Sequence, residues 1–136
     1  MHDLLIVHTD GAARGNPGPA GIGVVIESDT GEVVQRIARA IGRRTNNQAE
    51  YEAVIAGLTA AHALQAKQVT LMLDSELVAK QLRGAYRIKN ADLKRLSERA
   101  QALLQHFARV RIVHVPRGRN ADADRLANEG VDRALP

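Results

Sequence analysis

Residues 4–10 read Leu-Leu-Ile-Val-His-Thr-Asp, an apolar and β-branched run that is too short for a helix and predicts a strand ending at Asp10. Residues 68–74, Gln-Val-Thr-Leu-Met-Leu-Asp, repeat this pattern and end in Asp74. If the two strands are parallel neighbours, both aspartates emerge at the carboxyl edge of the sheet, where open α/β sheets bind ligands. Either aspartate alone could equally well begin a turn, and only the matched pair favours a site.

The segments around these two strands predict the rest of an α/β fold. A turn-rich loop from residue 11 is indicated by the residues that break regular structure before the second strand, namely Gly11, Gly15, Gly18, Gly21 and Gly23 with Pro17 and Pro19. Strands at about 20–28 and 32–41 form a hairpin through Asp29-Thr30-Gly31. Helices are expected at about 47–66, 75–83 and 91–107, followed by a strand at 109–115. In the last helix Asn120 is the expected N-cap, and one apolar face holds Ala123, Leu126, Ala127, Val131 and Ala134. The order predicts a five-stranded mixed sheet flanked by helices, in one domain over residues 1–136.

The composition of the 136 residues excludes several classes of protein. Hydrophobic residues make up 45% and charged residues 25%, and no apolar run approaches the ~20 residues of a membrane span. The absence of cysteine and of a visible signal peptide fits a cytoplasmic protein. A net charge of +4 favours a polyanionic partner, and three aromatic residues without Trp favour a duplex over a stacked single strand.

Two further carboxylates are expected to join the aspartates at this edge. Glu50 lies on an otherwise apolar stripe of the first helix, which aims it toward the sheet. The alternative for Glu50 is a capping box with Asn47, in which it only satisfies a backbone N–H. Asp124 lies in the first turn of the last helix, beside the apolar stripe, although the helix dipole alone also favours an acid there.

Carboxylates gathered at one edge would repel one another unless divalent cations compensate them. Oxygen ligands without cysteine or a well-placed histidine indicate Mg²⁺, with Mn²⁺ as a substitute. Two such ions roughly 3.5–4 Å apart are the usual apparatus for in-line phosphodiester cleavage. The four acids therefore predict a metal-dependent nuclease.

Four ordered motifs closely resemble those of type 1 ribonuclease H. They are Thr9-Asp10-Gly11-Ala12 with the glycine-rich segment 15–23, Thr45-Asn46-Asn47-Gln48-Ala49-Glu50, Leu73-Asp74-Ser75, and Ala123-Asp124 followed by Leu126-Ala127-Asn128. The resemblance covers essentially the whole chain. It implies a Mg²⁺-dependent endonuclease that hydrolyses the RNA strand of RNA/DNA hybrids and leaves 5′-phosphate and 3′-hydroxyl ends. Asp10, Glu50, Asp74 and Asp124 match its four catalytic metal-binding positions.

The same resemblance implies residues that bind the substrate. Gly11 and the glycine loop, with Asn16, Asn46 and Asn47, are expected to approach the shallow minor groove of a hybrid and test for 2′-hydroxyls. A turn or cap role is the alternative for these residues. Arg43, Thr45 and Asn90 match positions that grip a phosphate of the DNA strand in some members, while a solvated basic turn remains the alternative for Arg43.

The chain also departs from the family pattern. Many members carry a histidine in the loop before the last helix, whereas the loop here is Arg117-Gly118-Arg119. Arg117 is the candidate substitute, able to contact phosphate or the departing product but not to act as a base near neutral pH, and a plain surface charge is its alternative. Glu76 stands where several relatives have Gln, which weakens any inherited contact with a base edge. Only residues 84–90 separate two helices, so the basic protrusion of some members is absent and weaker, more salt-sensitive binding is expected.

Several alternatives stay open at this point. The short form without the loop histidine is similar to a prokaryotic branch in which some members also cut double-stranded RNA. A silent hybrid-binding module and a DNA-directed nuclease of the wider superfamily are the competing functions, although all four acids and the RNA-directed asparagines argue against them. A monomer is the default, and the sequence does not reveal whether the chain is a whole protein or one domain.

Overall fold

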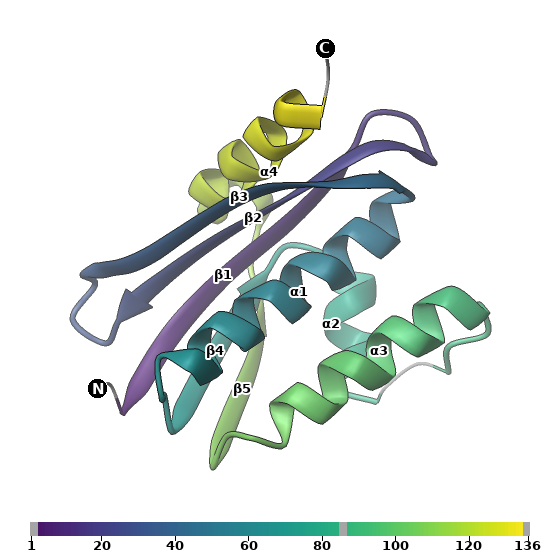
Figure 1. Cartoon of the computed structure of the whole chain (residues 1–136). Coiled ribbons are helices and arrows are strands. Elements are labelled where there is room, and N and C mark those ends of the chain that lie inside the picture. Colours follow the sequence, from purple (N-terminus) through teal and green to yellow (C-terminus); the bar gives the residue numbers. More distant parts are fainter. Residues whose placement is uncertain (1–2, 85–86, 135–136) are drawn as a thin grey trace.

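The structure, a computed structural model, describes residues 3–84 and 87–134, and every structural statement below refers to them. The strands are β1 (Leu4–Ala13), β2 (Gly18–Ser28), β3 (Val33–Arg44), β4 (Gln68–Leu73) and β5 (Arg109–His114). The helices are α1 (Asn46–Ala63), α2 (Glu76–Leu82), α3 (Ala91–Leu104) and α4 (Ala121–Ala134), with a single 3-10 turn at Arg117–Arg119 before α4 (Figure 1). Residues 85 and 86 of the expected 84–90 connection lie outside the described part, as does the side chain of Ala134.

The strands form one mixed sheet in the order β3-β2-β1-β4-β5. The first three strands pair antiparallel, while β4 is parallel to both β1 and β5. Helices α1 to α3 lie on one side of the sheet and α4 packs against β1, β2 and β3 on the other (Figure 1). The predicted α/β fold with a five-stranded mixed sheet and helices on both faces is confirmed.

The first strand does not end at Asp10, as the sequence predicted, but continues through Gly11 to Ala13. These residues keep pairing with β2 in unbroken register, from Gly11 opposite Ile22 to Ala13 opposite Ala20. The expected turn-rich loop at 11–19 is therefore confined to 14–17.

Gly21 and Gly23 of β2 allow α4 to pack closely on the sheet and do not reverse the chain. A Cβ atom on Gly23 would lie 2.0 Å from the carbonyl oxygen of Ala123, and one on Gly21 would lie 2.4 Å from the backbone nitrogen of Val131. Helix α4 approaches the sheet backbone so closely that only glycine fits. This contact places the first turn of α4 close to the sheet, so that Asp124 lies near Asp10 at the carboxyl edge of β1 and β4.

Two helices end earlier than predicted. Helix α1 stops at Ala63 because Gln65 takes a left-handed conformation, with φ 64°, and Ala66 donates to the carbonyl of Ala61 across the end. Helix α3 stops at Leu104, where the chain tightens into a turn and Phe107 packs edge-on against His62.

The main core lies between the sheet and α1. Buried side chains of β1, β2 and β4 meet those of α1, and the set includes Leu5, Val7, Val24, Val54, Leu58 and Leu71. A rigid, dry core under the carboxyl edge of β1 and β4 fixes the residues that follow these strands. Within the described ranges, none of the helices combines the length and the apolar character needed to cross a bilayer.

Candidate active site

Asp10 and Asp74 meet at the carboxyl edge of the two central parallel strands. The last paired residues before them are Thr9 and Leu73, so the aspartates follow neighbouring strand positions. One carboxylate oxygen from each of Asp10, Asp74 and Glu50 lies within 4.8 Å of the others. The convergence inferred from the two strand patterns is therefore present in the structure.

Asp124 completes the cluster from the opposite side of the sheet. It projects from the first turn of α4 and shares a pocket of about 460 Å³ with the other three carboxylates. Gly11, Asn46, Arg117 and Asn128 also line this pocket. Four acids thus face one open cavity, which we call the carboxylate pocket: one within β1, one directly after β4, and one each from α1 and α4.

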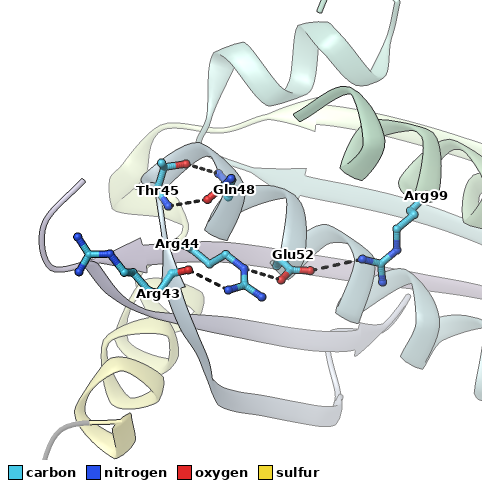
Figure 2. Close-up of polar contacts among 6 residues, drawn as sticks. All are labelled: Arg43, Arg44, Thr45, Gln48, Glu52 and Arg99. Carbon is cyan, nitrogen blue, oxygen red and sulfur yellow. Dashed lines mark hydrogen bonds and ion pairs between the residues drawn. The ribbon is translucent and has the colours of Figure 1, made fainter. Parts of the chain in front are cut away.

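Glu50 is held in place by the backbone of β1. Its Oε1 accepts a hydrogen bond of 3.1 Å from the N–H of Gly11. A Cβ atom at Gly11 would lie 2.2 Å from the carbonyl carbon of Ala49, so glycine alone allows this approach. The alternative for Glu50, a capping box with Asn47, is wrong. The N-cap of α1 is Thr45, and the capping box of this helix is formed by Thr45 and Gln48 (Figure 2).

Burial and crowding disfavour ionisation of two carboxylates in the pocket. Burial, followed by the neighbouring carboxylates, raises the pKa of Asp10 to about 10. Burial likewise raises the pKa of Glu50 to about 7, although hydrogen bonds from Asp10 and Gly11 act in the opposite direction. The other oxygen of Glu50, Oε2, is buried and accepts no hydrogen bond from the described residues. A cation would satisfy this atom and remove the cost of gathering the carboxylates.

The donor set fits Mg²⁺ or Mn²⁺. The cluster within reach of one ion consists of carboxylate oxygens from Asp10, Glu50 and Asp74, and Asp124 borders the same cavity. All-oxygen sets suit hard divalent cations, whereas zinc favours sites with nitrogen or sulfur ligands.

Asn120 contacts Asp74 of the carboxylate pocket, and the sequence did not predict this contact. Its Nδ2 donates to the carbonyl of Thr9 at 2.8 Å and to Oδ2 of Asp74 at 3.2 Å. The residue is 2% exposed, and its backbone carbonyl accepts from the N–H of Asp124 as an N-cap position should. The predicted side-chain cap is wrong, because Oδ1 has no partner among the described residues. The signal available in the sequence was an Asn directly before an expected helix, and it does not identify the distant partner.

Arg117 borders the carboxylate pocket from the exposed turn before α4. Its Nη2 lies 3.9 Å from Oδ1 of Asp124. A second residue near this edge is His114 at the end of β5, whose Nε2 is 3.3 Å from the carbonyl oxygen of Asp74. The sequence placed His114 inside a strand and gave it no role.

The asparagines expected to contact the minor groove lie at the start of α1 or are bonded to it. Asn16 accepts a hydrogen bond from the N–H of Asn46 at 3.0 Å, which joins the 14–17 turn to the start of α1 beside the carboxylate pocket. Asn47 is half-buried in the first turn of α1.

The predicted phosphate-binding residues lie beyond that pocket. Thr45 caps α1, and Asn90 caps α3 by accepting from the N–H of Leu93 at 3.0 Å. Arg43 is exposed at the end of β3 (Figure 2). It lines a groove other than the carboxylate pocket. Gly21 and Gly23, part of the expected glycine loop, are buried under α4 and do not line the carboxylate pocket.

Comparison with protein families and known structures agrees with this geometry. A family described as reverse transcriptase-like matches residues 8–130. Ribonuclease HI of Halobacterium salinarum is 50% identical over 125 residues, which are 92% of this chain and 63% of that protein. The crystal structure of the H. salinarum enzyme superposes with a TM-score of 0.94 at 48% identity and covers 96% of this chain and 98% of its own.

Two further relatives extend the comparison. The bifunctional protein Rv2228c of Mycobacterium tuberculosis is 46% identical over 131 residues, which are 96% of this chain but 36% of that protein. LC11-RNase H1, isolated from compost and solved in complex with an RNA/DNA hybrid, has a TM-score of 0.91 at 41% identity and covers 97% of this chain and 99% of its own. The chain thus spans only part of the length of these curated relatives, 36% of Rv2228c and 63% of the H. salinarum protein. The family match over most of the chain and the shared fold, with the four acids in one pocket, place this chain in the ribonuclease H family.

Proposed function

We propose that this chain is a metal-dependent endoribonuclease that hydrolyses the RNA strand of RNA/DNA hybrids and leaves 5′-phosphate and 3′-hydroxyl ends. The observation that carries the proposal is the carboxylate pocket, in which four acids from distant parts of the sequence face one cavity. The hybrid bound by the similar LC11-RNase H1 supports the choice of substrate.

Asp10, Glu50, Asp74 and Asp124 are the residues that would hold Mg²⁺, two ions in the active complex, or Mn²⁺ in its place. Bound cations would polarise the scissile phosphodiester and lower the pKa of the attacking water. The unpaired buried oxygen of Glu50 and the raised pKa of Asp10 support this assignment, because both are costs that a cation offsets.

The protein's own contribution is to hold these carboxylates ready before the substrate arrives. Gly11 fixes one oxygen of Glu50, and Asn120 fixes one oxygen of Asp74. Each carboxylate keeps its second oxygen for a cation, so little reorganisation is required on binding. Arg117 supplies a guanidinium at the rim, where it would attract the phosphate without exchanging a proton near neutral pH.

Substrate recognition is assigned to the start of α1 and the adjoining turn. Gly11 and Asn46 border the carboxylate pocket, and Asn16 is tied to Asn46. We propose that these residues and Asn47 approach the shallow minor groove and its 2′-hydroxyls. Arg43, Thr45 and Asn90 are proposed to hold a phosphate of the DNA strand.

A cleavage panel tests the proposal. End-labelled RNA/DNA hybrid, double-stranded RNA and double-stranded DNA are incubated with the protein in Mg²⁺, in Mn²⁺ and in EDTA. Mg²⁺-dependent cutting of the RNA strand of the hybrid, with 3′-hydroxyl products, is expected. Binding without cutting would indicate a silent hybrid-binding module, preferential cutting of DNA would indicate a DNA-directed nuclease, and either result would overturn the proposal. Cutting of double-stranded RNA as well would add a second activity.

A further inference from the structure

A second polar cavity lies between the sheet and the start of α4, which covers this face of β1 and β2 (Figure 1). It has a volume of about 250 Å³, and we call it the His8 cavity. Residues of three segments line it, namely β1, β2 and residues 118–123 around the beginning of α4. Among the described residues, none lines both this cavity and the carboxylate pocket. The His8 cavity is therefore separate from the site described above.

His8 and Glu27 meet in this cavity across the pair of strands β1 and β2. Val25 lies directly opposite His8, and Glu27 follows two residues further along the same face of β2. Nε2 of His8 lies 2.5 Å from Oε1 of Glu27, and the two side chains are 19% and 27% exposed. Despite this short distance, Nε2 of His8 is buried and makes no hydrogen bond among the described residues. A nitrogen and a carboxylate oxygen thus lie side by side without the geometry of a hydrogen bond.

Asn120 adds a second unsatisfied atom to the same cavity. Its amide nitrogen donates to Thr9 and Asp74, whereas its Oδ1 is buried without a partner among the described residues. The described part of the chain contains four such buried side-chain atoms. One is Oε2 of Glu50 in the carboxylate pocket, and two belong to residues that line the His8 cavity. Because unpaired buried polar atoms are unfavourable, the His8 cavity is expected to hold a ligand.

The chemistry of the lining indicates that this ligand is a cation. Oδ1 of Asn120 and the ionised carboxylate of Glu27 can only accept a hydrogen bond or bind a cation. Two acids, Glu27 and Asp122, line the cavity with one arginine, Arg119, so the charged side chains sum to one negative charge when His8 is neutral. Asp122 in the first turn also offsets the positive end of the α4 dipole. Since one water occupies roughly 30 Å³ in the liquid, the cavity has room for an ion with several waters.

We propose that the His8 cavity is a second cation site, which binds Zn²⁺ or a chemically similar divalent ion through Nε2 of His8, Oε1 of Glu27 and Oδ1 of Asn120. Imidazole nitrogen suits zinc, whereas the all-oxygen carboxylate pocket suits Mg²⁺. Ligand atoms of one zinc ion lie roughly 3 Å apart, so His8 and Glu27 need to separate only slightly. The ion would hold the oxygen of the same amide whose nitrogen binds Asp74, and would thereby support the carboxylate pocket from outside it.

Metal titrations of the full chain test the site directly. Co²⁺ and Zn²⁺ are the probes, and the Asp10→Asn background with excess Mg²⁺ disfavours their binding at the carboxylate pocket. Co²⁺ with four or five ligands absorbs visible light far more strongly than six-coordinate Co²⁺. We expect one Co²⁺ per chain with strong visible absorption, displaced by Zn²⁺ and not by Mg²⁺. Zn²⁺ should also raise the melting temperature, because it binds the folded state.

Two variants remove one proposed ligand each. His8→Asn and Glu27→Gln should each weaken Co²⁺ binding at least about tenfold, because loss of a mere outer partner of a metal ligand already costs about 10- to 100-fold. If His8→Asn does not fold, as judged by thermal melting, Glu27→Gln decides, since it keeps the shape of a partly exposed side chain. The matched control is His62→Gln/His106→Gln, which removes a stacked pair of histidines near the end of α1 and just after α3. This control should bind Co²⁺ as tightly as its background.

Nuclear magnetic resonance tests the third ligand. The side-chain amide signals of Asn120 are assigned by their absence from Asn120→Ala. Coordination of Oδ1 should shift these signals on addition of Zn²⁺ in excess Mg²⁺, and Glu27→Gln should abolish the shift at the same Zn²⁺ concentration. Signals that stay in place while Zn²⁺ binds would overturn the proposed ligand set.

The remaining outcomes are equally decisive. Failure to form a strongly absorbing Co²⁺ complex, or a complex kept by both His8→Asn and Glu27→Gln, would overturn the inference, and the cavity would then hold water beside a His8–Glu27 ion pair. Loss of the complex in the His62→Gln/His106→Gln control would place the ion on that pair instead and would also overturn the inference. None of these measurements uses cleavage, so the second cation site and the proposed function can fail independently of each other.

Discussion

Asn120 donates its side-chain amide to the Asp74 carboxylate at 3.2 Å, although 46 residues separate the two along the chain. The same nitrogen donates to the carbonyl of Thr9, immediately before Asp10. One buried side chain therefore connects Thr9 in β1, Asp74 after β4 and the start of α4, and three of the four acids lie at these points. The carboxylate pocket depends on this junction as much as on the acids themselves.

Asn120→Ala should impair cation binding more than it impairs folding. Loss of the amide removes a hydrogen bond that orients the Asp74 carboxylate. Loss of a residue that orients a metal-binding side chain in this way typically costs about 10- to 100-fold in metal affinity or activity. We expect a higher Mg²⁺ concentration for half-maximal cleavage and a lower kcat, with the far-ultraviolet circular dichroism spectrum retained. A folded Asn120→Ala protein with the parent's Mg²⁺ dependence would show that Asp74 needs no such support.

Asp10→Asn should have opposite effects on activity and on stability. The variant loses the central carboxylate and is expected to cut no hybrid detectably while still binding it. Since burial raises the pKa of Asp10 to about 10, a neutral amide there relieves an unfavourable buried acid. Urea unfolding in EDTA at pH 8 should therefore give a higher free energy of unfolding for Asp10→Asn than for the parent. Lower stability of Asp10→Asn would contradict the raised pKa of Asp10.

Much of this arrangement could be predicted from the sequence because it rests on local patterns. The two short apolar runs ending in aspartate predicted parallel neighbours, and the stripe on α1 predicted that Glu50 points inward. Both signals depend on the two-residue period of strands and the 3.6-residue period of helices. These periods can be read from the sequence without knowledge of the fold.

The errors concern contacts between distant segments. Gly21 and Gly23 were interpreted as loop glycines because glycine usually breaks a strand, yet here α4 packs on their bare backbone. Asn120 occupies the expected N-cap position, but the contacts of its side chain with Thr9 and Asp74 were not predicted, because those partners are far away in sequence. The groove that Arg43 and Arg44 share with Arg95 and Arg99 was missed for the same reason, since α3 supplies half of these arginines.

The metal-free protein should become less stable as pH rises. The folded pKa values of Asp10 and Glu50, about 10 and about 7, lie above the unfolded values of 3.8 and 4.5. The folded state therefore binds more protons than the unfolded state in these ranges. The stabilisation is complete below about pH 4 and is lost through pH 7 and then toward pH 10. Each group contributes a slope of at most about 1.4 kcal/mol per pH unit.

Urea unfolding in EDTA between pH 5 and pH 9 measures this slope, and Asp10→Asn should flatten it. Added Mg²⁺ should raise the unfolding midpoint more at pH 8 than at pH 5, because a cation favours the ionised carboxylates. Stability that rises with pH in the parent but not in the variant would contradict the raised pKa of Asp10.

Gly11→Ala should destabilise the fold and displace Glu50 together. The added Cβ would lie 2.2 Å from the carbonyl carbon of Ala49 and 2.4 Å from the backbone nitrogen of Glu50, so α1 must shift. Overpacking of this kind costs about 1–3 kcal/mol. Gly118→Ala is the control, since a Cβ there meets nothing within 4 Å. Equal melting temperatures for the two variants would show that β1 and α1 are less closely packed than described.

Arg117 offers both a positive charge and a planar pair of N–H donors at the rim of the carboxylate pocket, and two substitutions can separate these contributions. Its guanidinium is 84% exposed and lies 3.9 Å from Asp124, so its removal should hardly change stability. Arg117→Ala should lower kcat by about tenfold, the usual worth of a charge-assisted hydrogen bond to phosphate. Arg117→Lys should recover part of this loss, because the charge is restored without the planar donor pair. A pH–rate profile that is unchanged in shape, and merely lower, is expected for Arg117→Ala, since the guanidinium exchanges no proton. Full activity of Arg117→Ala would reduce Arg117 to a surface charge, and loss of one ionisation from the profile would mean that it acts through a titrating neighbour.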